Sequence, residues 1–113
     1  MKVIIAGSRT ITDYALVAHF IEKSGFTITE VVSGGAAGVD RIGEMWAMEN
    51  KVPFQIFPAN WDAFGKRAGV IRNARMAKYA EALIVLIKNN SAGSENMLKQ
   101  ATAAGLRVFV KRL

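Results

Sequence analysis

Short apolar runs alternate with longer amphipathic segments along the whole chain. The apolar runs are rich in β-branched residues and predict five strands, over 2–6, 27–32, 53–57, 82–87 and 107–111. The segments between them repeat apolar residues at helical spacing and predict four helices, over 13–24, 39–50, 66–79 and 95–104. Ser94 is expected to cap the last helix, and 59–65 to form a loop.

Strands that are separated by helices favour right-handed βαβ crossovers. We therefore predict an α/β fold, a Rossmann-like three-layer sandwich with a mostly parallel five-stranded sheet. The chain has 113 residues, enough for one hydrophobic core and too few for two. Residues 1–113 are accordingly expected to form a single domain.

Composition excludes several classes of protein. The chain is 51% hydrophobic and 21% charged, which is typical of globular proteins and not of disordered or fibrous ones. It contains no cysteine, which excludes a disulfide framework and thiolate metal sites. The single histidine, His19, argues against a zinc site as well. No metal and no cofactor are therefore expected.

Hydropathy and charge narrow the choice of partners. No apolar stretch approaches the roughly 20 residues that span a bilayer, and the first apolar run is too short for a signal peptide because Gly7 interrupts it. A cytoplasmic protein without a membrane partner is expected. The formal net charge of +6 favours an anionic partner, which includes nucleotides, RNA and DNA.

The most informative loop lies over 33–40 and reads SGGAAGVD. It joins a predicted strand to a predicted helix, where glycines expose amide groups and the helix N-terminus attracts a phosphate. Its spacing matches neither GxGxxG nor GxxxxGK[ST], so neither of those mechanisms is assumed. Asp40 falls in the first helical turn, where three roles are open to it: it stabilises the helix alone, orients the glycine loop, or accepts hydrogen bonds from ribose hydroxyls.

Two more loops follow strands at the same edge of the predicted sheet, where ligands of parallel sheets bind. Gly7, Ser8 and Arg9 combine small residues with a guanidinium that suits phosphate, the alternative being a tight turn with a solvated arginine. Gly93 and Ser94 precede the last helix and predict a second anion cradle, the alternative being a capped surface turn.

The segment 66–78 contains five basic residues and no acid, a pattern that usually marks a solvated helix face. Arg72 and Asn73 differ from the rest because they directly follow two apolar residues, and we expect them to present polar groups toward the strand ends. Trp61, just before this segment, either stacks on a base or packs into the core.

Five motifs together resemble the YspA-like branch of the SLOG superfamily, which also includes DprA/Smf proteins and Lonely Guy phosphoribohydrolases: GSR, SGGAAGVD, PANW, RNARM and GSENM. The resemblance spans nearly the whole chain and implies a Rossmann-like nucleotide-binding domain that self-associates, with nucleic acid as an alternative partner because DprA-type members bind single-stranded DNA. It implies that the ligand contacts are Gly7, Ser8, Arg9, Ser33, Gly34, Gly35, Ala36, Gly38, Asp40, Arg72, Asn73, Gly93 and Ser94.

One position departs from the Lonely Guy pattern. Enzymes of that family carry a catalytic glutamate in PGGxGTxxE, and Met97 occupies its place here, where a thioether cannot act as an acid or base. Glu95 lies two residues earlier, about 200° around a helix. The candidate catalytic residues that remain are Asp40, Arg72 and Glu95.

Three functions follow from these residues. The first is a sensor or sequestering module that binds a nucleotide or nucleotide-derived ligand, such as an ADP-ribose derivative, at the C-terminal edge of the sheet. The second is an enzyme that hydrolyses the N-glycosidic bond of a nucleotide. The third is single-stranded DNA binding of the DprA kind, which the charge favours and the scarcity of aromatic residues does not.

Overall fold

The computed structural model describes residues 1–113 and contains one sheet of five parallel strands. The strands run in the spatial order β3-β2-β1-β4-β5. Their bounds are Lys2–Gly7 (β1), Glu30–Ser33 (β2), Phe54–Ile56 (β3), Ala82–Ile87 (β4) and Arg107–Arg112 (β5). The α/β class and the parallel five-stranded sheet predicted from the sequence are confirmed.

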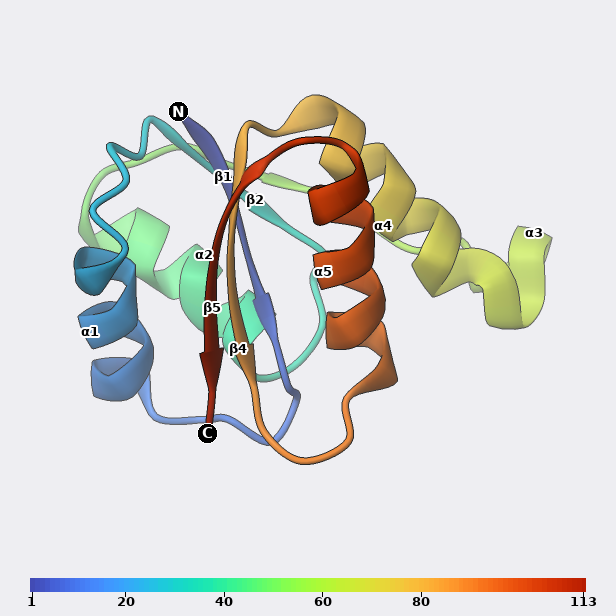
Figure 1. Cartoon of the computed structure of the whole chain (residues 1–113), viewed down its shortest axis with the longest axis horizontal. Coiled ribbons are helices and arrows are strands. Elements are labelled where there is room, and N and C mark those ends of the chain that lie inside the picture. The colour runs from blue at the N-terminus through green and yellow to red at the C-terminus, as the bar shows by residue number, and fades with distance from the viewer.

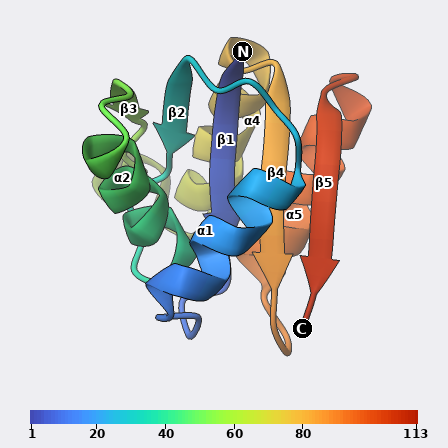
Figure 2. The same ribbon diagram turned by 90° about the vertical axis from the view of Figure 1, so that its left-hand side faces the viewer.

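Helices cover both faces of the sheet, which gives three layers (Figures 1 and 2). On one face lie α1 (Tyr14–Lys23) and α2 (Val39–Glu49), and on the other lie α4 (Ala68–Tyr79) and α5 (Ala92–Ala103). A short helix, α3 (Trp61–Phe64), and a 3-10 turn over Gly65–Arg67 precede α4. Figure 1 shows α3 projecting from the body of the molecule. None of these helices combines the length and the hydrophobicity that a membrane span requires.

The central strands β1 and β4 divide the hydrophobic core in two. All six residues of β4 are buried, and successive side chains point to opposite faces of the sheet. Ile84 and Leu86 pack in the cluster beneath α1 and α2, whereas Leu83 and Val85 pack in the cluster beneath α4 and α5. A continuous apolar run is therefore the pattern that a strand needs when both of its faces are covered.

Most boundaries lie within one or two residues of the sequence prediction, and three larger differences have a structural reason. The second strand begins at Glu30, because Thr29 pairs with Met1 outside the ladder: its amide and its hydroxyl both donate to the Met1 carbonyl. The predicted loop 59–65 contains α3, which is capped by the Asn60 side chain accepting from the amide of Ala63 at 3.0 Å.

The last helix also begins earlier than predicted, at Ala92, with Ser91 as its N-cap residue. Ser94 lies within the first turn instead, where its hydroxyl accepts a hydrogen bond of 2.7 Å from Ser91. Three additional residues, 92–94, therefore belong to the helix.

The sheet order creates a crevice between β1 and β4. The connection from β1 leads to one side of the sheet through α1, and the connection from β4 leads to the other through α5, so the two loops diverge at the carboxyl edge. Such a switch point is where parallel α/β folds bind ligands.

Close packing of α2 on β1 predicts an effect of substituting Gly43. A Cβ atom there would lie 2.8 Å from Cγ2 of Ile5 and 2.9 Å from its Cβ, inside the core. We expect Gly43→Ala to lower the free energy of unfolding by about 1–3 kcal/mol, despite the higher helix propensity of alanine. Urea unfolding measures this change.

Gly69 provides the matched control, because it also lies in a helix and an added Cβ would meet only Trp61, at 3.7 Å. Gly69→Ala should leave stability unchanged or raise it by up to about 1 kcal/mol. Equal stability of the two variants would contradict the close approach of α2 to the sheet.

Candidate functional site

A polar cavity of about 350 Å³ opens between the carboxyl ends of β1 and β4. Its walls come from the loop after β1, the start of α2, the middle of α4, and the start of α5 with the loop before it. The volume lies at the lower end of the range for small-molecule sites. The cavity therefore suits a compact ligand more than an extended one.

The N-terminus of α5 provides one wall of this cavity. Ala92, Gly93 and Ser94 all line it, and their amide groups donate to no acceptor within the protein. A Cβ at Gly93 would meet nothing within 4 Å, which shows how open the backbone is there. Unpaired amides at a helix N-terminus carry partial positive charge and attract an anion.

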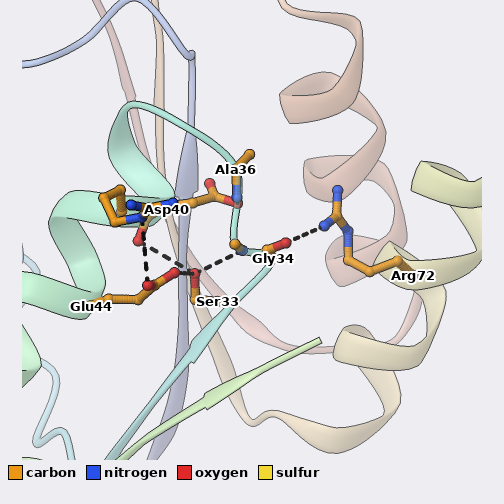
Figure 3. A network of polar contacts seen from close by, with 8 residues as sticks. Ser33, Gly34, Ala36, Asp40, Glu44 and Arg72 are labelled. Atoms are coloured by element: carbon orange, nitrogen blue, oxygen red, sulfur yellow. Dashed lines mark hydrogen bonds and ion pairs between the residues drawn. The ribbon is translucent and has the colours of Figure 1, made fainter. Parts of the chain in front are cut away.

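Arg72 reaches over the cavity from α4 (Figure 3). Its Nη1 donates to the carbonyl oxygen of Gly34 at 2.6 Å, and its Nε donates to Oδ1 of Asn73 at 2.9 Å. Burial lowers the pKa of this guanidinium, while the nearby Asp40 raises it. Nη2 has no partner in the protein, so the fork keeps one donor group for a ligand.

Asp40 is the carboxylate that lines the cavity, and it is almost completely buried. Burial raises its pKa from 3.8 to about 6, because the charged form loses its hydration. The amides of Ala36 and Gly7 and the charge of Arg72 lower the pKa, whereas Glu44 raises it. The side chain accepts from the Ala36 amide at 3.4 Å, so Asp40 already serves as an anion for the glycine loop.

Ser33 and Glu44 hold the same loop from behind (Figure 3). The Ser33 hydroxyl donates to Oε2 of Glu44 at 2.6 Å and accepts from the amide of Gly35 at 3.1 Å. Both side chains are buried outside the cavity. These contacts fix the shape of the loop and leave the Ser33 hydroxyl no role at the cavity surface.

The structure brings most of the predicted ligand residues together at one cavity. Those that line it are Gly7, Ser8, Arg9, Ala36, Asp40, Arg72, Asn73, Gly93 and Ser94. Those that lie behind its wall are Ser33, Gly34, Gly35 and Gly38. The glycine loop therefore supports the cavity, and the amides exposed to it belong mainly to α5.

Of the three candidate catalytic residues, Asp40 and Arg72 meet at the cavity and Glu95 does not. Glu95 is exposed and forms a two-pronged ion pair with Arg112, at 2.7 and 3.1 Å, which lowers the pKa of Glu95. Met97 points the other way and lines the cavity. The rotation between positions 95 and 97 expected on a helix is therefore observed.

Sequence reasoning missed several lining residues, among them Lys88, Thr10 and Met76. Lys88 follows β4 directly, and its position at a strand end was the available signal. The Ser8 hydroxyl accepts from the amide of Lys88 at 2.8 Å, which ties the loops after β1 and β4 together. No cluster of three His, Cys, Asp or Glu side chains that would hold a metal ion is present.

The raised pKa of Asp40 predicts a specific dependence of stability on pH. Because the folded-state pKa, about 6, lies above the ordinary value of 3.8, the native state holds the proton more tightly than the unfolded chain. Relative to Asp40→Asn, the free energy of unfolding of the wild type should fall by about 2 kcal/mol as pH rises from 4 to 6, and level off near pH 7.

Urea unfolding of both proteins between pH 4 and pH 8 measures this difference. The exposed Asp62 supplies a matched control, Asp62→Asn, which makes the same substitution outside the cavity. A wild-type minus Asp40→Asn difference that stays constant from pH 4 to pH 6 would show that the carboxyl titrates normally.

Comparison with known proteins places this architecture in a family. Gene 61 protein of Mycobacterium phage D29 is 32% identical over 118 residues, which cover 96% of this chain and 94% of that protein. The structure of DNA processing protein A (DprA) from Streptococcus pneumoniae superposes with a TM-score of 0.78 at 23% identity, over 96% of this chain. The present chain spans about half, 49%, of that DprA chain, and the likeness shows a shared fold. A model of the YspA, cpYpsA-related SLOG family matches residues 1–64, and the chain belongs to this family.

Proposed function

We propose that the protein binds a small nucleotide-derived molecule, with a phosphate group of that molecule at the N-terminus of α5. The observation that carries the proposal is that three unpaired amides, of Ala92, Gly93 and Ser94, share one cavity with the Arg72 guanidinium. Arg9 and Lys88 line the same cavity and add positive charge. Helix N-termini and forked guanidinium groups are both suited to phosphate oxygens.

Asp40 determines what the opposite side of the cavity accepts. A second phosphate beside this carboxylate would be repelled whenever Asp40 is ionised, and the glycine-loop amide of Ala36 is already paired with it. Hydroxyl groups, by contrast, donate hydrogen bonds to a carboxylate. We therefore orient the ligand with its phosphate toward α5 and its ribose hydroxyls toward Asp40.

The cavity favours recognition over turnover. Met97 stands where the Lonely Guy pattern has its catalytic glutamate, and it lines the cavity with a thioether that transfers no proton. Glu95 lies away from the cavity and is paired with Arg112. Membership of the SLOG family supports a nucleotide-type ligand, and a sensor or sequestering role for that ligand fits a site without a second carboxylate.

Calorimetric titration with AMP, ADP-ribose and adenosine tests this proposal. We expect AMP or ADP-ribose to bind and adenosine to bind at least tenfold more weakly, because only adenosine lacks a phosphate. Arg72→Ala should raise the Kd of the phosphate-bearing ligand about tenfold or more, since it removes a charge-assisted hydrogen bond. Chromatography after prolonged incubation should recover the ligand intact.

Arg75→Ala is the matched control, because Arg75 lies on the same helix, is exposed and does not line the cavity. It should leave the Kd within about twofold of the wild type. Equal effects of the two substitutions, or equal binding of AMP and adenosine, would contradict a phosphate site at Arg72. Release of free base would overturn recognition in favour of hydrolysis.

A second candidate function is the binding of single-stranded DNA by the projecting segment around α3. Trp61 and Phe64 are 55% and 48% exposed there, and Lys66 and Arg67 follow them directly. Aromatic faces beside basic side chains suit stacked bases and their phosphates. A gel shift with a single-stranded oligonucleotide at low and moderate salt separates the two candidates, because Trp61→Ala should weaken this binding and leave the Kd of AMP unchanged.

A further inference from the structure

Asn73 is a buried amide whose polar atoms are all engaged within the protein. It lies in the first half of α4 and is 4% exposed. Its Oδ1 accepts from Nε of Arg72 at 2.9 Å, and its Nδ2 donates to the carbonyl oxygen of Gly93 at 3.2 Å and to Oδ1 of Asn96 at 3.0 Å. Both amide protons are therefore used, and no donor remains for a ligand.

These three bonds join the two elements of the phosphate site. One of them orients the Arg72 guanidinium on α4, and the other two hold the first turn of α5. The rest of the contact between α4 and α5 includes apolar side chains such as Met76 and Met97, which fix a distance less sharply than directional hydrogen bonds do. Asn73 is thus the polar link between the guanidinium and the helix N-terminus.

We propose that Asn73 is a positioning residue for phosphate recognition, and that it sets the separation and angle between the Arg72 fork and the α5 amides. With Nε held by Asn73 and Nη1 held by the Gly34 carbonyl, the plane of the guanidinium is fixed and Nη2 is directed at the cavity. This inference rests on the proposed function, and it replaces direct ligand contact by Asn73 with an indirect role.

Two substitutions separate the parts of this role. Asn73→Leu is close in size and removes every hydrogen bond. Asn73→Asp keeps an oxygen that accepts from Arg72, but it loses both donors and places negative charge against the Gly93 carbonyl and the Asn96 amide oxygen. In Asn73→Leu, both the Arg72 guanidinium and the start of α5 therefore lose their hydrogen bonds to residue 73. In Asn73→Asp, only the start of α5 loses them.

A double-mutant cycle with Arg72→Ala distinguishes positioning from general stabilisation. Asn73→Leu should raise the Kd of AMP about tenfold in the wild type and less than threefold in the Arg72→Ala background, because the group it orients is then absent. Calorimetry well below the Tm of each variant measures both effects. Additive effects of the two substitutions would overturn the proposal, since they would mean that Asn73 acts independently of Arg72.

A ligand-independent readout comes from the arginine Nε–H signals in a ¹⁵N-correlated NMR spectrum. A hydrogen-bonded Arg72 Nε–H should give a resolved, slowly exchanging resonance, which Arg72→Lys identifies by removing it. Asn73→Asp should retain this resonance and Asn73→Leu should abolish it. If Asn73→Leu leaves the resonance unchanged, the proposal is wrong.

The two measurements separate this inference from the function on which it rests. Loss of the resonance in Asn73→Leu, combined with no binding of AMP or ADP-ribose to the wild type, would contradict the proposed ligand while the contact between Asn73 and Arg72 stands. Binding of AMP that depends on Arg72, combined with an unchanged resonance, would support the ligand and refute the role of Asn73.

Discussion

The buried carboxylate of Asp40 determines how the carboxyl edge of this sheet is used. It sits at the start of α2 and accepts from the amide of Ala36 (Figure 3). The Gly7 amide and the charge of Arg72 stabilise its charged form. Glycine loops at this position of parallel α/β folds commonly present their amides to a phosphate. Here an internal anion takes part of that role, because the Asp40 carboxylate already accepts from the amide of Ala36.

That internal pairing moves the anion site across the crevice. The opposite wall has unpaired amides at the N-terminus of α5, and Arg72 spans the two walls by donating to the Gly34 carbonyl while it faces the cavity. Burial shifts the pKa values of Asp40 and Arg72 toward their neutral forms, and the charge of each residue opposes this shift in the other. The pair leaves one side of the cavity suited to phosphate and the other to hydroxyl groups.

Much of the fold could be predicted from the sequence, because β1 and β4 are continuous apolar runs between amphipathic helices. The short helix α3 could not, since four residues carry no periodicity and its Asn60 cap resembles a loop residue. The membership of Arg72 in the site was predictable from its place directly after two apolar residues of a basic helix. The sequence could not predict that both amide protons of Asn73 are used within the protein, because their acceptors on Gly93 and Asn96 lie 20 and 23 residues away. The sequence left open whether Asp40 orients its own loop or accepts from ribose hydroxyls, and spacing alone does not decide between these roles.

The measurement that tests this account most directly is the change in backbone amide chemical shifts when AMP is titrated into ¹⁵N-labelled protein. An anion seated on α5 should shift the amides of Gly93 and Ser94 most strongly, and the amide of Ala36, which is paired with Asp40, much less. The largest shifts at residues 34–38, with those of Gly93 and Ser94 unchanged, would place the phosphate on the glycine loop and contradict the account.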